Sequence, residues 1–278
     1  MDFSIIIPLY NEQKNVNDLL ESLRNLNYDS SLFEIIMVDN RSTDDTAEVV
    51  AGFGQVILLQ EGKRGSYAAR NKGVEYAKGR YICFTDADCL VDTNWLLEAK
   101  KATTQKKESP EMIAGKIINT EPDKNLFSRY DDLCFLKQER LVSDGGAATA
   151  NLVTKKEVFD IAGKFDARMS TGGDMEFVQR AVQHGFKLVY NEKMIVYHKS
   201  RTSFSQVRNK LLRFWKNERR YPGLFNKIVS LCVFPGAKTI IKAFQDQSIR
   251  LKEFVFLLFL SLLLGISVTG VVIRQKLL

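Results

Sequence analysis

Two aspartates, Asp86 and Asp88, come just after the short apolar run Tyr81–Phe84 and Thr85. A run of this length and composition predicts a buried strand, so the two carboxylates stand at the end of a core element. Their spacing lets both side chains approach one divalent cation, whether the chain continues as a strand or turns. In open α/β sheets, ligands bind at the carboxyl ends of the strands. The sequence therefore predicts a metal site at Asp86 and Asp88, with a solvated Asp-rich turn as the alternative.

Three earlier apolar runs are separated by helix-length segments and predict strands at Phe3–Ile7, Glu34–Val38 and Val56–Leu59. A helix is expected at 67–78, before the strand that ends at Asp86. This alternation predicts an α/β fold with a doubly wound, mostly parallel sheet flanked by helices. Loops that follow parallel strands share one edge of the sheet, which is therefore the expected ligand crevice. The polar residues of these loops are Tyr10, Asn11, Asp39, Arg64 and Gly65.

Several classes of protein are disfavoured by what these loops and the composition lack. No GxGxxG or GxxxxGK[ST] pattern occurs, which lowers the expectation of a dinucleotide cofactor or a P-loop ATPase. The four cysteines have no CxxC spacing and the chain has two histidines, so a zinc site and a disulfide framework are not expected. This cysteine usage fits a reducing cytosol.

Four fragments that occur in order carry a family resemblance. They are IIIPLYNE at 5–12, VDNRSTDDT at 38–46, GSYAARN at 65–71 and FTDADC at 84–89. Together they resemble the nucleotide-binding half of family 2 glycosyltransferases, over about residues 3–100. The resemblance implies a GT-A fold, a nucleoside-diphosphate sugar as donor, usually with uracil as the base, and a divalent metal, Mn²⁺ or Mg²⁺.

The resemblance also implies roles for the donor-side residues. Asp39 would hydrogen-bond the base, and Asp88 would be a metal ligand beside Asp86, which lies towards the ribose or the donor sugar. A hard cation held by carboxylates suits a diphosphate leaving group because it neutralises negative charge as the glycosidic bond breaks. A helix-capping loop acid is the alternative for Asp39, and a mid-helix surface position is the alternative for Arg70. The predicted donor-binding residues are Pro8, Tyr10, Glu12, Asp39, Arg70, Asp86 and Asp88.

The stretch Ser170–Arg180 holds the candidate catalytic base, Asp174. Gly172 and Gly173 allow a tight turn that aims Asp174 at the crevice from a helix N-terminus. Family members resemble this stretch with Gly-Glu-Asp-x-Glu, and Gly173 stands where Glu is frequent. The resemblance implies that Asp174 removes the proton of the acceptor hydroxyl as the hydroxyl attacks the anomeric carbon, with inversion of configuration. A helix N-cap is the alternative for Asp174.

The second half of the domain supplies the remaining candidates. His198 ends a predicted strand at Met194–Tyr197, where related enzymes often place a histidine that completes metal or diphosphate binding; a structural histidine is the alternative. A further strand is expected at Phe186–Tyr190, and one helix is expected over Phe127–Leu141. An i,i+4 surface pair is the alternative for Glu176 and Arg180. The predicted acceptor-side or supporting residues are Asn151, Gly173, Glu176 and Arg180.

The C-terminal part differs in charge from the rest. Residues 1–198 contain 25 Lys and Arg against 30 Asp and Glu, whereas residues 199–278 contain 15 against 3. Aromatic and basic residues interleave in 203–220, which predicts a helix lying on an anionic lipid surface, with nucleic-acid binding as the disfavoured rival. The 20 uncharged residues 254–273 are long enough to cross a bilayer, with a buried core helix as the alternative. Basic residues before this segment favour a cytosolic catalytic domain.

The sequence therefore predicts an inverting, metal-dependent glycosyltransferase, bound to the inner membrane by one C-terminal transmembrane helix. The expected acceptor is a glycan or a lipid-linked molecule, and nucleic acid is not an expected partner. A nucleotidyltransferase and a catalytically silent, membrane-tethered binding module are the alternatives. Expected segments are a nucleotide-sugar-binding half (1–100), an acceptor half of the same domain (101–201), a basic juxtamembrane region (202–253) and the span (254–273).

Overall fold

The computed structural model describes residues 1–104, 109–121, 123–218 and 236–276, with side chains omitted at 214–218 and 272–276. It divides into two compact units. Unit 1 comprises 1–118 and 138–199, and unit 2 comprises 119–137 and 200–278. The segment 119–137 thus clusters with the C-terminal part of the chain, and the functional boundaries expected at 100, 201 and 253 stay predictions. Arg219 and Arg220, at the end of the predicted basic helix, lie outside the described residues.

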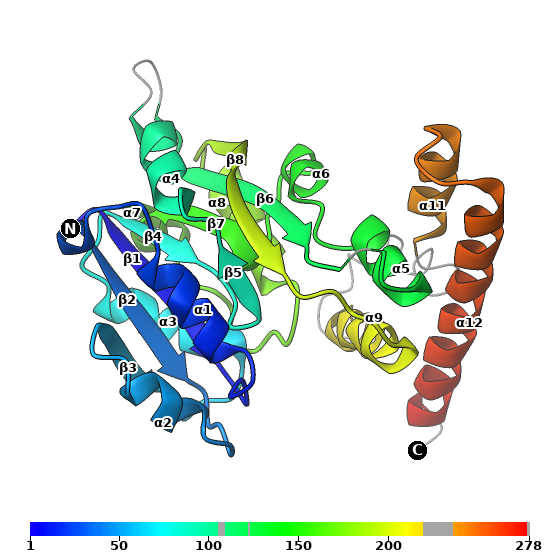
Figure 1. The fold of residues 1–278 in the computed structure, drawn as a ribbon, viewed down its shortest axis with the longest axis horizontal. Coiled ribbons are helices and arrows are strands. Elements are labelled where there is room, and N and C mark those ends of the chain that lie inside the picture. The colour runs from blue at the N-terminus through cyan, green and yellow to red at the C-terminus, as the bar shows by residue number, and fades with distance from the viewer. Residues whose placement is uncertain (105–108, 122, 219–235, 277–278) are drawn as a thin grey trace. The chain divides into compact units, whose positions relative to one another are not determined.

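Unit 1 is built on an eight-stranded sheet of order β3-β2-β1-β4-β7-β6-β8-β5. The first four strands in this order pair in parallel, as the sequence predicts, and Figure 1 shows β1 and β2 running side by side. The central strand β1 is buried along almost its whole length because helices cover both faces of the sheet. These parallel strands are β1 (Phe3–Leu9), β2 (Phe33–Asp39), β3 (Val56–Gln60) and β4 (Tyr81–Phe84).

The sheet continues beyond β4 with antiparallel pairings. Strand β7 pairs antiparallel with both β4 and β6, and β5 pairs antiparallel with β8. The predicted α/β fold is confirmed, with parallel pairing through β3-β2-β1-β4, and the strands beyond β4 add an antiparallel extension that the sequence did not predict. The strands of this extension are β5 (Cys89–Val91), β6 (Met112–Asn119), β7 (Leu152–Lys155) and β8 (Leu188–His198).

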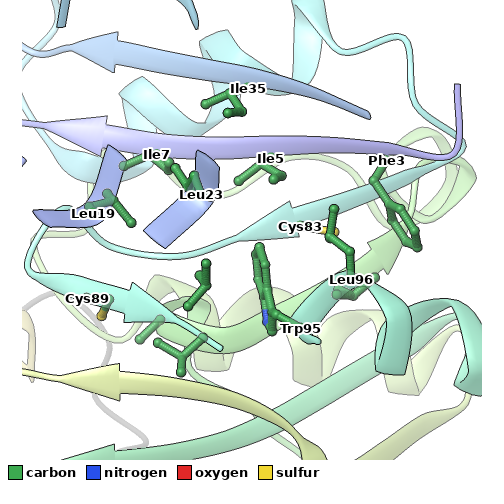
Figure 2. Packing of buried hydrophobic residues seen from close by; sticks show 14 of the residues in the cluster. Phe3, Ile5, Ile7, Leu19, Leu23, Ile35, Cys83, Cys89, Trp95 and Leu96 are labelled. Carbon is green, nitrogen blue, oxygen red and sulfur yellow. The ribbon is translucent and has the colours of Figure 1, made fainter. Parts of the chain in front are cut away.

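The core of unit 1 lies where one face of β1 meets two helices. Phe3, Ile5 and Ile7 alternate towards this face and pack with the apolar stripe of α1 (Val16–Arg24) and with Trp95 of α4 (Trp95–Thr103) (Figure 2). Helix α3 (Ser66–Tyr76) covers the other face. Its Gly73 approaches Ile6 so closely that an added Cβ would lie 2.5 Å from the Ile6 side chain. The other helices of unit 1 are η1 (Ser30–Leu32), α2 (Thr46–Ala51), α6 (Gln138–Ser143), η2 (Thr149–Asn151), α7 (Glu157–Ala162) and α8 (Gly173–Gln183).

Two predicted elements differ from the structure. The single helix expected over Phe127–Leu141 is two helices, α5 (Leu126–Cys134) and α6, because Leu136 between them has a left-handed backbone with φ 55°. The separate strands expected at Phe186–Tyr190 and Met194–Tyr197 form one strand, β8. The residues between them stay extended: Glu192 and Lys193 are exposed, and the Asn191 side chain donates to the Glu98 carbonyl at 3.3 Å.

Unit 2 is helical and has its own apolar core. Helix α12 (Leu251–Lys276) packs one side against α5, α9 (Phe204–Glu218) and α11 (Ala237–Gln245). An ion pair of 2.7 Å joins Arg129 of α5 to Glu253 at the start of α12. The window Leu251–Val271 of α12 is long and apolar enough to cross a membrane by length and composition alone, with a mean hydropathy of 2.5, and 33% of the window is buried.

Candidate functional site

The carboxyl ends of β1, β2 and β3 are aligned at one edge of the sheet. The register pairs Leu9 with Asp39, and Asp39 with Gln60, so the three strands end side by side. The loops that follow therefore emerge together, as the sequence predicts for a parallel arrangement. This edge of unit 1 is the candidate donor site.

Asparagine side chains join these loops to one another. Asn40 is 5% exposed; its Nδ2 donates to the carbonyls of Glu61 (3.0 Å) and Lys63 (2.8 Å), and its Oδ1 accepts the N–H of Gly65 (2.7 Å). Asn11 accepts the Thr43 N–H at 2.8 Å. Sequence analysis missed the role of Asn40, although its place directly after Asp39 in the second motif was a usable signal. The loops are thus fixed by side-chain bonds that replace missing strand pairing.

Three donor-side candidates at the ends of β1 and β2 differ in their environment. Pro8 lies inside β1, which continues past the predicted end at Ile7; its missing N–H is tolerated because pairing with β4 ends at Ile6. Tyr10 is 48% exposed at this edge of the sheet, where its ring is accessible to a planar ligand. Asp39 is 3% exposed, and both of its carboxylate oxygens accept the N–H of Ser42 at 3.3 Å.

Several carboxylates gather beside the first loop. Burial raises the pKa of Glu12, the Asn15 amide opposes this shift, and the charges of Asp88 and Asp86 raise the pKa further. These acids are therefore close enough to repel one another. A bound cation would relieve the repulsion, and carboxylate oxygens are the ligands that Mg²⁺ and Mn²⁺ prefer. The side chains present fit a divalent cation that also takes phosphate oxygens from its ligand.

Arg70 anchors Asp86 from inside the protein. Its side chain is 4% exposed, and its guanidinium forms an ion pair with the Asp86 carboxylate. The mid-helix surface alternative for Arg70 is therefore wrong. Its Nε is buried and has no hydrogen-bond partner among the residues that the structure describes. A buried positive charge therefore lies directly beside the Asp86 carboxylate at the candidate site.

His198 lies next to Asp88 although 110 residues separate them in the sequence. Strands β5 and β8 pair Cys89 with His198, and this register brings His198 Nε2 to 3.7 Å from Asp88 Oδ2. His198 is 3% exposed. Within the described ranges, no group of three or more His, Cys, Asp or Glu side chains converges as a complete metal cage. An ion held here would need the substrate's own oxygens, as in sites that bind metal together with phosphates.

Asp174 is positioned by the start of α8. Gly172 is the N-cap residue, in a left-handed conformation with φ 73°, so the N-cap alternative for Asp174 is wrong. One carboxylate oxygen of Asp174 accepts the Tyr67 hydroxyl at 3.0 Å, and the other accepts the Thr149 N–H at 3.3 Å. The Tyr67 ring lies 5.5 Å from the Arg70 guanidinium, which in turn pairs with Asp86. Two buried side chains, Tyr67 and Arg70, thus connect Asp174 to Asp86 at the candidate donor site.

Two other acceptor-side candidates bond to each other. Arg180 Nε lies 2.7 Å from Glu176 Oε1, one turn apart on α8, and Arg180 also donates to the Lys164 carbonyl at 2.9 Å. This arrangement is the i,i+4 pair that the sequence offered as the alternative. Gly173 is buried, and its N–H donates to the Tyr67 hydroxyl at 2.9 Å.

Asn151 lies in the core behind the candidate site. Its side chain is fully buried, its Nδ2 donates to the carbonyls of Lys116 (2.9 Å) and Met194 (2.8 Å), and its Oδ1 accepts from Trp95 Nε1 (2.9 Å). Every polar atom of this amide is satisfied by the protein. Its supporting role is therefore to join η2 to β6, β8 and α4.

Comparison with known proteins places this geometry in a family. Residues 4–165 match Glycosyl transferase family 2. The glycosyltransferase AglE of Haloferax volcanii is 30% identical over 222 residues, which cover 77% of this chain and 72% of AglE. The chain belongs to glycosyl transferase family 2. As a member of this family it is a glycosyltransferase, and the nucleotidyltransferase and silent-module alternatives are set aside.

Solved structures of family-like folds agree with the sheet described above. The TarS structure from Staphylococcus aureus in complex with UDP-GlcNAc has a TM-score of 0.61 at 19% identity, covering 77% of this chain and 66% of the TarS chain. The mannosyltransferase PcManGT of Pyrobaculum calidifontis, in complex with GDP-Man and Mn²⁺, has a TM-score of 0.60 at 16% identity, covering 98% of this chain and 75% of PcManGT. These likenesses confirm the predicted GT-A fold of the family 2 glycosyltransferase.

Proposed function

We propose that this family 2 glycosyltransferase transfers a sugar from a nucleoside-diphosphate sugar, with uridine as the nucleoside, to a hydroxyl of a glycan or lipid-linked acceptor. The observation that carries the proposal is the single rim of unit 1. There Asp39 ends β2, the acids beside Glu12 and Asp86 follow other parallel strands, and Arg70 of α3 pairs with Asp86; Asp174 accepts a hydrogen bond from Tyr67 of the same helix α3. The structures of TarS with UDP-GlcNAc and of PcManGT with GDP-Man and Mn²⁺ support a nucleotide sugar as donor.

Acidic, aromatic and basic side chains would together hold the donor. Asp39 would accept a hydrogen bond from the base, Tyr10 would cover the nucleoside, and Arg70 would contribute positive charge towards the diphosphate. Asp86, Asp88 and His198 would hold a divalent cation, Mn²⁺ or Mg²⁺, together with the diphosphate oxygens. When bound, such a cation neutralises the charge that develops on the leaving group.

The transfer step follows from where Asp174 stands. The acceptor hydroxyl oxygen would attack the anomeric carbon as the bond from that carbon to the diphosphate oxygen breaks, and the hydroxyl proton would pass to the Asp174 carboxylate. The nucleoside diphosphate leaves on the opposite face, so the configuration inverts. Asp174 is half-exposed, which leaves its carboxylate open to an acceptor from solvent.

A screen of nucleotide sugars tests the donor class. With Mn²⁺ present, a UDP-sugar at about 100 times its Kd should raise the Tm by roughly 5 °C or more, because a ligand that binds only the folded state stabilises it by about 2.7 kcal/mol. Chelation of the metal should remove most of this rise, and transfer should release a nucleoside diphosphate rather than pyrophosphate. ADP- and GDP-sugars are the controls. If no nucleotide sugar raises the Tm, the donor proposal is wrong.

Lipid contact is proposed for the side of α12 that is not packed in unit 2. Leu257, Leu260 and Leu264 face the unit's core, whereas Phe256 (49%), Phe259 (57%) and Ile266 (61%) are exposed. An exposed apolar stripe next to a strongly basic segment fits a bilayer with anionic lipid. We therefore place the protein at the cytosolic face of the inner membrane, which brings the site to lipid-linked acceptors.

Vesicle flotation tests this placement with the full chain. The protein should float with vesicles that contain phosphatidylglycerol, and less with purely zwitterionic vesicles or in high salt, because screening weakens the electrostatic part. Replacing Phe256, Phe259 and Ile266 together by Ser should abolish flotation, while the same number of Ser substitutions at the exposed Ile57, Ile161 and Val182 of unit 1 serves as the control. Equal flotation of both variants would contradict lipid contact through α12.

A further inference from the structure

Tyr67 forms a buried bridge to the segment that carries Asp174. Its hydroxyl donates to Asp174 Oδ1 at 3.0 Å and accepts the N–H of Gly173 at 2.9 Å. The side chain is 5% exposed. Burial raises the pKa of Tyr67 well above its ordinary value, and the Asp174 charge raises it further, so the hydroxyl keeps its proton and remains a donor.

The ring of Tyr67 is held as firmly as its hydroxyl. It stacks on Phe165 with 5.7 Å between the ring centroids, and the Arg70 guanidinium lies 5.5 Å from its centroid. The Phe165 backbone is clamped by Asn71, whose side chain accepts the Phe165 N–H at 3.0 Å and donates to the Phe165 carbonyl at 2.8 Å. Tyr67, Arg70 and Asn71 are one turn apart on α3 and therefore share one face. The position of the hydroxyl is thus set by packing on several sides.

Gly173 leaves the space that the Tyr67 ring occupies. A Cβ at position 173 would lie 2.8 Å from Tyr67 Cε2 and 3.0 Å from Cζ, which is closer than real Cβ contacts allow. The Tyr67 ring can therefore occupy its position only because residue 173 has no side chain.

We infer that Tyr67 is the positioning residue of the Asp174 carboxylate, and that glycine at 173 is required for Tyr67 to reach it. The inference rests on the proposed function, in which Asp174 accepts the acceptor proton. The Tyr67 hydroxyl and the Met175 N–H bond one oxygen of Asp174 and the Thr149 N–H bonds the other, so Tyr67 is the side chain among the donors that fix the plane of the carboxylate. Tyr67 also contacts Arg70, which pairs with Asp86. The same ring therefore holds Asp174 in a fixed position relative to Asp86 at the candidate donor site.

Tyr67→Phe tests the hydroxyl while keeping the ring contacts. We expect kcat to fall roughly 10- to 100-fold, the range that follows from losing one hydrogen bond to a charged group. The KM and Kd of the nucleotide sugar should stay within about twofold, since Tyr67 is not placed in donor binding. Tyr76→Phe is the matched control, because Tyr76 lies on the same helix and is 51% exposed. A purely structural role would lower donor binding and kcat together and would not produce this split.

Gly173→Ala tests whether the Tyr67 ring needs the space that the glycine leaves. In the wild-type background the new methyl should displace the ring and lower kcat, again with little change in donor KM. In a Tyr67→Ala background, where the ring is absent, the same substitution should have almost no further effect, so the double-mutant cycle should be strongly non-additive. Additive effects would show that Gly173 does not act through Tyr67 and would overturn that half of the inference.

The outcomes separate this inference from the function on which it rests. Wild-type kcat in Tyr67→Phe, together with an inactive Asp174→Asn, would overturn the positioning role alone. Wild-type turnover in Asp174→Asn would overturn the base assignment and, with it, the inference. Should Tyr67→Phe lose its cooperative thermal transition, Gly173→Ala alone still decides the question, because it keeps the Tyr67 hydroxyl and should lower kcat with little change in donor KM; an unchanged kcat would overturn the inference.

Discussion

Asp174→Asn should lower sugar transfer by about a thousandfold, within the 10²–10⁴ range expected for loss of a general base. Asn has nearly the shape of Asp and can still accept the Tyr67 hydroxyl, but its amide cannot take the acceptor proton. The initial rate of transfer at saturating donor is the measurement. Donor Kd, measured by calorimetry, should stay close to that of the wild-type protein because the substitution lies on the acceptor side.

The control for this charge change is Asp160→Asn. Asp160 is an exposed acid on the nearby helix α7, away from the bonded network of Tyr67 and Asp174. It should leave both rate and Tm unchanged, since isolated surface substitutions alter stability by only about 0.5 kcal/mol. If Asp174→Asn transferred sugar at the wild-type rate, the assignment of Asp174 as base would be wrong, whatever donor the enzyme uses.

Asp88→Ala should remove the metal dependence of donor binding and weaken nucleotide-sugar affinity by about 100-fold or more, equivalent to roughly 2.8 kcal/mol. The cause is that Asp88 lies beside His198, the other proposed ligand, whereas the Asp86 carboxylate already pairs with Arg70. Without Asp88, His198 and Asp86 would offer too few ligands to hold a hard cation beside the diphosphate. Calorimetric titration of the donor with and without Mn²⁺ is the measurement.

Asp18→Ala is the matched control, because Asp18 is an exposed acid on α1 and its loss changes the net charge equally. It should bind donor with the wild-type metal dependence. An Asp88→Ala titration that superimposes on the wild-type titration would refute the metal role of Asp88. Weaker binding with an unaltered response to Mn²⁺ would assign Asp88 to direct contact with the donor instead.

The nucleotide-side half of the fold was readable because its patterns are local. Short apolar runs, each followed by a polar loop, identify strands and their ends, and parallel strands must bring those ends to one edge. The register of Leu9 with Asp39 and of Asp39 with Gln60 bears this out. The acceptor-side half was read less well, since the break at Leu136 and the continuity of β8 depend on what each segment packs against.

The residues of the candidate site likewise differ in whether the sequence could identify their roles. Asp39, Asp86, Asp88 and Asp174 were singled out by residue type and motif, and their chemistry does not depend on knowing their neighbours. The burial of Asn151 and the pairing of Arg70 with Asp86 were not readable, because an amide or a guanidinium looks alike in sequence whether it faces solvent or the core.

The sequence alone therefore determined the family, the GT-A fold and the acids expected at the donor rim, because these follow from short-range periodicity and from motifs on neighbouring strand ends. Only the tertiary structure decided that Tyr67 meets Asp174, 107 residues away, and that Gly173 makes room for the ring. Contacts of this kind depend on the shapes of packed surfaces and on distances of a few tenths of an ångström, for which the order of residues along the chain carries no local signal.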